Sequence, residues 1–432
     1  MLRDAGDESH DGVLPLTALK IGYVTSRFPK LTETFILYEI LGLEREGFEV
    51  EFYPLQRERT DVLHPEAIPV MERAHYLPFL SRAILRSHLD LVRGSPRTYL
   101  GTLVSVLRGT FGSLKFLVGG IVFFPKVAHA ARLLSEEGVT HVHCHFATHA
   151  ALAGFVIHRL TGIPYSFTAA GSDLHVDRRM LCRKVAEAAF VVAISNYNRD
   201  VIVDECGETG SEKIRVIHSG IDTSFFRPRH NGRSSGRLRI LCVGTLHEVK
   251  GQTYLIEACR LLAEAGVDVV CDLVGDGPDR DALRRQIEEA GLNERVTLLG
   301  PRTRHQVAEL LARADVVATP SVPTKAGRRE GIPVVLMEAL ACGLPVVASA
   351  ISGIPELAEQ ERTGLLVPPG DPAALAQALR RIHDDVALSR RLGAAGREKV
   401  VREYDAYGNA ARLAREIARI DEVDRPKPPP SR

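Results

Sequence analysis

Short β-rich runs alternate with helical stretches along nearly the whole chain, and this alternation is the feature that most restricts the fold. The pattern begins with IGYV (21–24), continues with an apolar helical stretch and returns to strand in FEVEFYPL (48–55), which alternates with a period of two. A strand–helix–strand opening needs a crossover connection, and such crossovers are right-handed and join parallel strands. The expected fold is therefore α/β, with parallel sheets covered by helices.

The alternation falls into two sets, separated by the polar segment FRPRHNGRSSGR (226–237). Further strands are expected in THVHCHF, YSFTAAGSD, AAFVVAIS and KIRVIHSGID before this segment, and in LRILCVGTL, VDVVCDLVGDGP, RVTLLGP, ADVVATPS, LPVVAS and TGLLVPPGD after it. A chain of 432 residues also exceeds the size at which a single core usually stops growing. We therefore expect two domains that bind their ligands in the cleft between them, at the carboxyl ends of the strands.

Composition supports a cytoplasmic chain with unstructured ends. The expected parts are a disordered leader (1–18), an N-terminal domain (19–225), a linker (226–237), a C-terminal domain (238–402), a helix that returns to the N-terminal domain (403–421) and a disordered, proline-rich tail (422–432). The leader is polar and acidic, unlike a signal peptide. The most apolar window, FLVGGIVFFPKV (116–127), is shorter than the roughly 20 residues that span a bilayer. Seven scattered cysteines, most of them in apolar runs, fit free thiols in a reducing setting.

Charge is balanced over the chain but not within residues 76–135. Lysine and arginine number 55 against 54 acidic residues, a balance that argues against a nucleic-acid partner. Within 76–135, apolar residues are interspersed with arginines at positions 82, 86, 93, 97 and 108, which indicates amphipathic helices. These helices either cover the sheet or present a basic, apolar face to the inner surface of a membrane. We prefer the first interpretation, because so long a span also needs core contacts.

The apolar segment REGIPVVLMEALACGLPVV (329–347) contains two carboxylates, Glu330 and Glu338, eight positions apart. Pro333 suits the first turn of a helix, and the unpaired N–H groups at such a helix start, around Gly331, form an anion site. Carboxylates beside a bound anion can accept hydrogen bonds from sugar hydroxyls. Alternatively, one glutamate is favoured by the helix dipole and the other is an unrelated buried carboxylate. Residue chemistry alone leaves both interpretations open.

EGIPVVLME resembles the E-x7-E motif of retaining glycosyltransferases of the GT-B fold, glycosyltransferase family 4. The blocks HCHFATHAA, GIPYSFTAAGSDLHV, AISNYNRD, VIHSGID, LVGDGPDRDAL, ELLARADVVATPS and GLPVVASAISGIPELAE follow in the order of that family. The opening GYVTSRFPKLTETFILYEI looks like that of the bacterial exopolysaccharide or colanic-acid-type group 1 members. The resemblance implies two Rossmann-like parallel-sheet domains that face each other across a cleft, and no catalytic metal.

The resemblance also implies roles for individual residues. Glu330 would lie near the reacting carbon of the transferred sugar, and Lys250 would neutralise charge on the departing diphosphate. Glu338 would hold the ribose hydroxyls. The other expected donor-binding residues are Gly331, Ile332, Pro333, Thr245, Gly244, Gly275 and Arg302, and those on the acceptor side or in the cleft are His145, Ala170, Gly171 and Asp173.

Two positions depart from the family pattern. Ala170 stands where the family usually has a histidine, and Thr245 stands where it usually has an arginine. Alanine offers no hydrogen-bond donor, and threonine cannot make the bidentate phosphate contact of a guanidinium. Compensating groups are expected among the neighbours in sequence, namely Asp173, His175, Lys325, Arg328 and Arg329.

The run HVHCH places His141, His143 and His145 on one face of a strand. A zinc site would need further ligands of compatible geometry, and none stands out in the sequence. We therefore expect no metal, and the resemblance places His145 at the acceptor side of the cleft.

The expected function is a cytoplasmic, metal-independent retaining hexosyltransferase. Its donor would be a nucleotide-sugar, with a UDP-sugar as first choice and GDP-mannose as second, and its acceptor an exopolysaccharide or a lipid-linked saccharide. An alternative, motivated by Ala170 and Thr245, is an impaired relative that binds a nucleotide-sugar or serves as a complex subunit. A dehydrogenase is the third alternative, but VGDGP (274–278) offers only G-x-G of the dinucleotide fingerprint.

Overall fold

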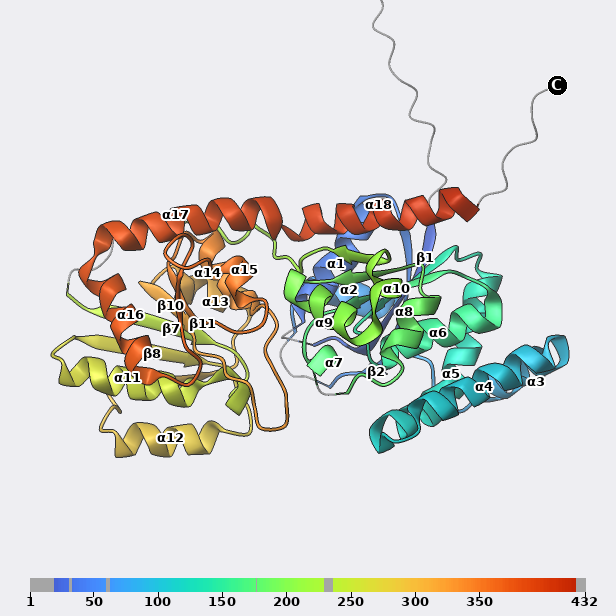
Figure 1. The fold of residues 1–432 in the computed structure, drawn as a ribbon, viewed down its shortest axis with the longest axis horizontal. Helices are drawn as coiled ribbons and strands as arrows, with labels where there is room; N and C mark the ends of the chain where they lie inside the picture. Colours follow the sequence, from blue (N-terminus) through green and yellow to red (C-terminus); the bar gives the residue numbers. More distant parts are fainter. Residues whose placement is uncertain (1–18, 31–32, 60–62, 176, 229–235, 425–432) are drawn as a thin grey trace, which may run out of the picture.

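The computed structural model describes residues 19–30, 33–59, 63–175, 177–228 and 236–424. The expected leader, residues 229–235 of the expected linker and residues 425–432 of the expected tail therefore lie outside the described residues. The described chain forms two halves, each built on a sheet with helices on both faces (Figure 1). The prediction of an α/β fold with two parallel-sheet domains is confirmed.

The N-terminal half contains the first six strands. In chain order its elements are β1 (Lys20–Phe28), α1 (Thr34–Arg45), β2 (Glu49–Arg57), α2 (Ala67–Glu72), α3 (Arg82–Gly94), α4 (Pro96–Thr110), α5 (Leu114–Glu136), β3 (His141–His145), α6 (His149–Thr161), β4 (Tyr165–Ala169), α7 (Ser172–His175), α8 (Leu181–Glu187), β5 (Phe190–Ala193), α9 (Asn196–Cys206), α10 (Glu208–Ser211) and β6 (Ile214–Val216). The strands pair in parallel in the order β2-β1-β3-β4-β5-β6.

The C-terminal half contains the other six strands. Its elements are β7 (Leu238–Val243), the 3₁₀-helix η1 (Glu248–Lys250), α11 (Gln252–Glu264), β8 (Val269–Val274), α12 (Arg280–Glu289), β9 (Val296–Gly300), α13 (Arg304–Leu311), β10 (Val316–Thr319), α14 (Val334–Ala341), β11 (Val346–Ser349), α15 (Ile354–Leu357), β12 (Leu365–Val367), α16 (Pro372–Asp384) and α17 (Val386–Glu403). Its strands pair in parallel in the order β12-β11-β10-β7-β8-β9. The last helix, α18 (Ala406–Asp424), follows these elements in the chain and packs on the N-terminal half. Each strand of both sheets overlaps a run that was predicted as strand.

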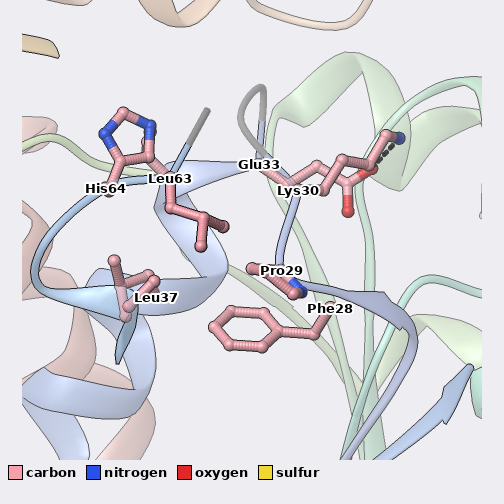
Figure 2. Close-up of a pocket in the computed structure, with 9 residues that line it drawn as sticks. Phe28, Pro29, Lys30, Glu33, Leu37, Leu63 and His64 are labelled. Carbon is pink, nitrogen blue, oxygen red and sulfur yellow. Dashed lines mark hydrogen bonds and ion pairs between the residues drawn. The ribbon is translucent and has the colours of Figure 1, made fainter. Parts of the chain in front are cut away.

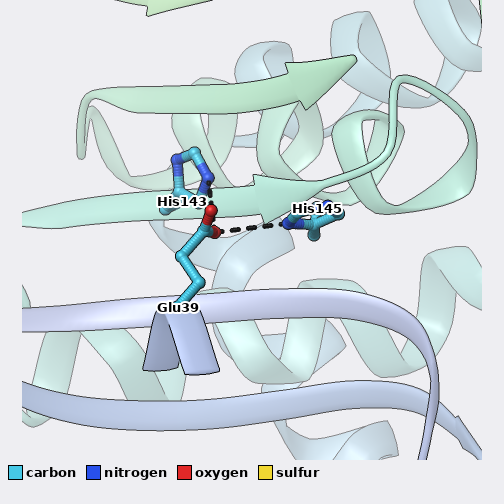
Figure 3. Close-up of side chains that lie close together, drawn as sticks. All are labelled: Glu39, His143 and His145. Atoms are coloured by element: carbon cyan, nitrogen blue, oxygen red, sulfur yellow. Dashed lines mark hydrogen bonds and ion pairs between the residues drawn. The ribbon is translucent and has the colours of Figure 1, made fainter. Parts of the chain in front are cut away.

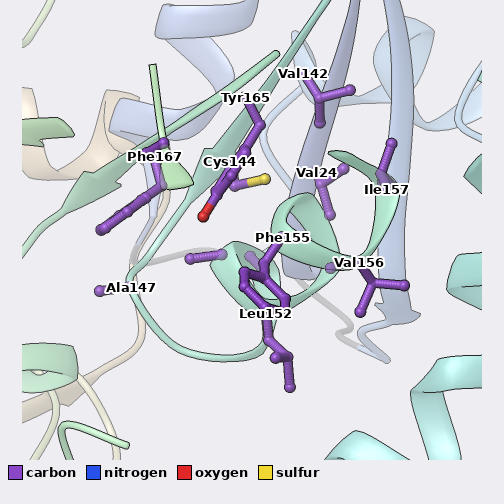
Figure 4. Packing of buried hydrophobic residues seen from close by; sticks show 14 of the residues in the cluster. Val24, Val142, Cys144, Ala147, Leu152, Phe155, Val156, Ile157, Tyr165 and Phe167 are labelled. Atoms are coloured by element: carbon purple, nitrogen blue, oxygen red, sulfur yellow. The ribbon is translucent and has the colours of Figure 1, made fainter. Parts of the chain in front are cut away.

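The central strands are buried on both faces because helices cover both sides of each sheet. In the N-terminal core, Cys144 of β3 and Tyr165 of β4 pack against Phe155 and Ile157 of α6 (Figure 4). A Cβ atom on Gly154 of α6 would lie 2.5 Å from the Cys144 sulfur. The glycine therefore lets helix and sheet approach closely.

Residues 76–135 form α3, α4 and α5, and the second half of α5 covers the sheet with Phe124, Val127 and Leu134 in the core. Among the described residues, α5 is the one helix that is long and apolar enough to cross a membrane by length and composition, with a mean hydropathy of 1.4. The helix is longer than the window expected from the sequence, since it continues past Lys126 to Glu136. Lys126 is buried within it, and its Nζ donates a hydrogen bond to the Leu55 carbonyl at 2.6 Å. Burial lowers the pKa of Lys126 to about 8.

The chain crosses between the halves twice, at neighbouring places. After the second sheet, α18 lies along α1 of the N-terminal half, where Leu413 and Ile417 join the core around Ile40 (Figure 1). Just before α18, the Ile221 N–H donates to the Tyr404 carbonyl at 3.0 Å, and the Ala406 N–H donates to the Ile221 carbonyl at 2.8 Å. The returning chain therefore pairs with the outgoing chain.

Two cysteines differ from the expectation of free thiols. Cys182 of α8 and Cys206 at the end of α9 form a disulfide, with their Cα atoms 4.9 Å apart. They are 24 positions apart in sequence, and only the packing of α8 on α9 brings them together. The buried Cys144, Cys242, Cys259 and Cys271 are thiols that pack as small apolar groups.

Candidate active site

A cleft of about 640 Å³ separates the carboxyl ends of the strands in the two halves. This volume lies within the range of small-molecule pockets, about 300–1,000 Å³. Residues from both halves line it, and among them are twelve that the sequence singled out: Ala170, Gly171, Gly244, Thr245, Lys250, Gly275, Arg302, Glu330, Gly331, Ile332, Pro333 and Glu338. His145 and Asp173 do not line the cleft.

The segment that begins α14 forms one wall of the cleft. Pro333 is the N-cap residue of α14 rather than part of its first turn, so Glu338 lies about one turn into the helix, closer to its start than expected. The N–H groups at this start have no partner within the helix. A Cβ atom on Gly331 would lie 2.8 Å from the Ala170 carbonyl oxygen, so glycine is needed where the two halves meet.

Lys250 and Glu330 form an ion pair across the cleft wall. Lys250 Nζ lies 2.6 Å from Glu330 Oε2, with side chains only 22% and 17% exposed. Lys250 ends η1 and is followed by Gly251, whose φ is 67° and whose Cβ atom would lie 1.9 Å from the Pro320 carbonyl oxygen. The turn that presents the ammonium group therefore requires glycine.

Glu338 is a half-buried carboxyl group that lines the cleft, and among the described residues it forms no ion pair. Burial raises the pKa of Glu338 to about 7, against an opposing effect of the Arg304 charge. The carboxyl group is therefore half-protonated near neutral pH and would gain from hydroxyl donors in the cleft.

Arg304 is a site residue that sequence reasoning missed. It lies on α13, is 6% exposed, and donates hydrogen bonds to Tyr38 and Glu66 of the N-terminal half, the latter at 3.2 Å, and to Asp222 at 3.0 Å. Its guanidinium carbon also lies 3.7 Å from the centre of the Phe225 ring. The partners are 82 to 266 positions away in sequence, so no local pattern identified it.

Glu356 is a second missed residue that joins the halves. From α15 of the C-terminal half, its carboxylate accepts hydrogen bonds from the N–H groups of Asn196 and Tyr197, each at 2.8 Å. These N–H groups begin α9 of the N-terminal half, where a carboxylate is favoured by the helix dipole. The only sequence signal was its position in the block GLPVVASAISGIPELAE, which carried no predicted role for it.

Of the residues expected to compensate for Ala170 and Thr245, only some lie where they could contact a ligand in the cleft. The Asp173 carboxylate accepts from the N–H groups of Ala147, Ala170 and Gly171, at 2.8, 3.2 and 2.6 Å, so it orders the loop after β4. Among the other expected compensating residues, Arg328 and Arg329 line the cleft, whereas His175 and Lys325 do not. Positive charge therefore remains beside Glu330, although Thr245 supplies none.

The strand histidines meet a carboxylate that the sequence did not connect with them. Glu39 of α1 points toward His143 and His145, and ligand atoms of the three residues lie within 4.8 Å of one another, close enough to hold a metal ion (Figure 3). Hydrogen bonds also join the group: Glu39 Oε1 accepts from the Tyr23 hydroxyl at 2.5 Å and lies 3.2 Å from His145 Nδ1. Burial raises the pKa of Glu39, but the two histidines outweigh it and hold that pKa well below its usual range. The expectation of no metal stays a prediction.

A smaller recess opens beside the cleft in the N-terminal half. Its lining includes Phe28, Pro29 and Leu37, and it shares Lys30 and Glu33 with the cleft (Figure 2). Its volume is only about 10 Å³, which is room for about one water molecule.

Two family profiles match successive parts of the chain. The one described as "Glycosyltransferase Family 4" matches residues 32–225, and the one described as "Glycosyl transferases group 1" matches residues 225–399. The glycosyltransferase WcaL assigned to colanic acid biosynthesis in Escherichia coli (strain K12) is 32% identical over 84% of this chain and 90% of its own length. The amylovoran biosynthesis glycosyltransferase AmsK of Erwinia amylovora is 30% identical over 93% of this chain and 100% of its own length.

A solved structure shares the fold. HepE of Anabaena, crystallised in complex with UDP-glucose, superposes with a TM-score of 0.68 over 93% of this chain and 100% of its own, at 19% identity.

Proposed function

The chain belongs to the group 1 glycosyltransferases of glycosyltransferase family 4, and on this premise we propose that it transfers a sugar, with retention of anomeric configuration, from a nucleoside-diphosphate donor to a saccharide acceptor. The ion pair between Lys250 and Glu330 at the start of α14 is the observation that carries this proposal. It puts a cation suited to a diphosphate beside a carboxylate suited to sugar hydroxyls.

We propose that the donor lies along the start of α14. The Glu338 carboxylate accepts hydrogen bonds from the ribose hydroxyls, and Glu330 accepts them from the transferred sugar. The N–H groups of Gly331 and Ile332 contact the diphosphate, which is favoured at a helix start. The common position of these groups in one cleft supports this arrangement.

In the proposed reaction, the bond between the anomeric carbon and the diphosphate oxygen breaks while the acceptor oxygen bonds to the same face of that carbon. The acceptor's hydroxyl proton passes to the departing diphosphate oxygen. Lys250 and the N–H groups at the helix start stabilise the charge that develops on the leaving group. Arg328 and Arg329 add positive potential at the cleft wall.

We propose a UDP-sugar as donor and an exopolysaccharide or lipid-linked precursor as acceptor. The UDP-glucose complex of HepE supports the first, and the exopolysaccharide names of WcaL and AmsK support the second. GDP-mannose is the competing donor. The part of the cleft lined by the N-terminal half, which includes Phe35, Phe146 and Ala170, is the proposed acceptor side, because the proposed donor lies along the C-terminal half.

A nucleotide panel tests the donor. Because a ligand that binds only the folded protein raises its melting temperature, UDP and UDP-sugars should shift the transition more than GDP and GDP-mannose do. Nucleotide release from each sugar donor then measures turnover. A larger shift with GDP-mannose reverses the donor assignment, and no shift with any nucleotide-sugar contradicts the proposed function.

Ala170 and Thr245 favour a second candidate, a relative that binds the donor without turning it over. The cleft then holds a nucleotide-sugar as a regulatory or structural ligand. Ala170→His distinguishes the two: turnover that appears only in this variant supports the second candidate, and turnover by the unaltered chain excludes it.

A further inference from the structure

Exposed apolar side chains are concentrated in the segment 79–122. Among the described residues, fifteen large hydrophobic side chains are exposed, and twelve of them lie in this segment. They are Phe79, Leu80, Leu85, Leu89, Val92, Leu100, Val104, Phe111, Leu114, Val118, Ile121 and Val122, here called the apolar face. Such a concentration on a soluble domain marks an interaction surface.

The apolar face follows helical spacing. On α5, Leu114, Val118 and Ile121 are exposed along one side, while Phe116 and Phe124 are buried on the other. The spacing repeats on α3 with residues 85, 89 and 92, and on α4 with residues 100 and 104, while Phe111 directly follows the end of α4. In Figure 1, α3 and α4 lie at the margin of the N-terminal half, away from the C-terminal half. The face is therefore a property of the folded helices and not of an isolated loop.

The charged residues beside the apolar face are basic with one exception. Segment 79–122 contains six basic residues, all exposed, at positions 82, 86, 93, 97, 108 and 115, and its single acidic residue is Asp90. Asp90 already forms an ion pair with Arg132. Apolar side chains bordered by arginine and lysine match the acyl chains and anionic headgroups of a membrane surface.

We propose that the apolar face docks the protein on an anionic phospholipid bilayer. The face lies on the membrane and does not cross it. Although α5 is long enough to span, its second half belongs to the core through Val127 and Leu134, and Lys126 is fixed inside the fold by its hydrogen bond to Leu55. Only its first turns are available to lipid.

The tip between α4 and α5 is tied to the segment that follows α7. The Ser113 hydroxyl donates to the Asp177 carboxylate at 2.5 Å, and the Arg179 guanidinium donates to the carbonyls of Phe111 and Gly112. Helix α7 lies between these residues and Ala170, which lines the cleft. The apolar face therefore belongs to the half of the molecule that supplies Ala170 to the cleft.

Vesicle flotation tests the proposal without donor or turnover, so its outcome is independent of the proposed function. The full chain is mixed with vesicles of phosphatidylethanolamine and phosphatidylglycerol, or of phosphatidylcholine alone. We expect binding to the anionic vesicles that weakens with added salt. Phe111→Ser with Leu114→Ser should weaken partitioning about tenfold or more, since these side chains are 74% and 78% exposed. Arg82→Glu with Arg86→Glu should remove the preference for anionic lipid.

Val386→Ser with Val401→Ser is the matched control, because these valines are 41% and 45% exposed on the C-terminal half and should bind as the unaltered chain does. The chain contains no tryptophan, so Phe111→Trp adds a single fluorophore that keeps the face apolar. Its emission should shift to the blue with anionic vesicles, whereas that of Val401→Trp should not.

Three results would overturn the proposal. The first is that the protein does not float with anionic vesicles, and the second is that the emission of Phe111→Trp does not shift in their presence. The third is that the protein binds no vesicles and forms a dimer in solution, which Phe111→Ser with Leu114→Ser converts to a monomer. The last result would assign the face to a second copy of the chain.

Discussion

At the scale of single residues, the two cleft carboxylates are in different electrostatic states. Glu330 is paired with an ammonium group, whereas half-buried Glu338 has a pKa of about 7. Holding Glu338 in ionised form costs folding free energy, and its proposed role in binding ribose hydroxyls would account for that cost.

Glu338→Gln should make the unliganded protein more stable at high pH and weaken its donor binding. The pKa of Glu338 is raised by folding from 4.5 to about 7, so its contribution to stability is present below pH 4.5 and is lost as pH rises through 7. The free energy of unfolding of Glu338→Gln, measured with denaturant relative to the unaltered chain, should therefore be about 1–3 kcal/mol more favourable to the variant at pH 8 than at pH 5.

Donor titrations provide the second readout for this variant. UDP-glucose affinity of the unaltered chain should rise between pH 6 and 8 as the carboxylate forms, and that of Glu338→Gln should stay low and flat. Glu361→Gln, at a 52% exposed surface position, is the control. Parallel pH profiles for the unaltered chain and Glu338→Gln would exclude the carboxylate from donor binding.

Lys250→Ala should slow nucleotide release from the sugar donor by about 100-fold, because the developing diphosphate charge loses its cation. Lys20→Ala is a close control: Lys20 is also ion-paired and 22% exposed, but it lies at the start of β1. Steady-state rates with a UDP-sugar measure the effect. Equal rates for the two variants would remove Lys250 from the mechanism.

At the scale of elements, the strands were predictable and the turns that carry the site were predictable in part. Runs such as VVCDLV and VVAT indicate buried parallel strands because they are short and mostly apolar, with one polar residue each. Their carboxyl ends then locate the cleft, and Gly275 and Arg302, which the family resemblance had singled out, line it. The position of the α14 start relative to Glu338 was not predictable, because Pro333 fits both the N-cap and the first turn.

Gly251→Ala should disable the turn that presents Lys250. Its positive φ and the nearby Pro320 carbonyl both oppose a side chain, so a loss of about 2 kcal/mol or more is expected. Gly266→Ala separates the two causes, since Gly266 has a φ of 77° but nothing within 4 Å of a Cβ atom. It should cost about 1 kcal/mol and leave UDP binding intact.

Thermal unfolding with and without UDP measures both effects. If Gly251→Ala and Gly266→Ala had the same melting temperature and the same affinity for UDP, the contact of residue 251 with the Pro320 carbonyl would not matter for the site.

At the scale of the whole molecule, side chains that join the two halves decide how far the cleft is closed. Arg304 and Glu356 both bridge the halves, and neither was predictable, because each is an ordinary helix residue until its partner's position is known. The sequence therefore yielded two domains and most of the cleft lining, but not the contacts that hold the domains in this relation.

Glu356→Ala should shift the protein toward an open cleft. Removing the carboxylate from the start of α9 costs about 1 kcal/mol of interdomain contact, which changes the ratio of closed to open forms about fivefold. The radius of gyration from small-angle X-ray scattering should increase without UDP and return to that of the unaltered chain with saturating UDP. Glu361→Ala, also in the C-terminal half, should leave the radius unchanged; an unchanged radius for Glu356→Ala as well would contradict the role of this contact.

The paired crossings at Ile221 and Ala406 have a mechanical consequence. Two connections joined by hydrogen bonds resist sliding and twisting of the halves more than a single connection would. A hinge motion about these crossings would change three separations together: Gly331 from Ala170, Arg304 from Glu66, and Glu356 from Asn196. Distance probes on these three pairs should therefore change in the same direction when the cleft opens.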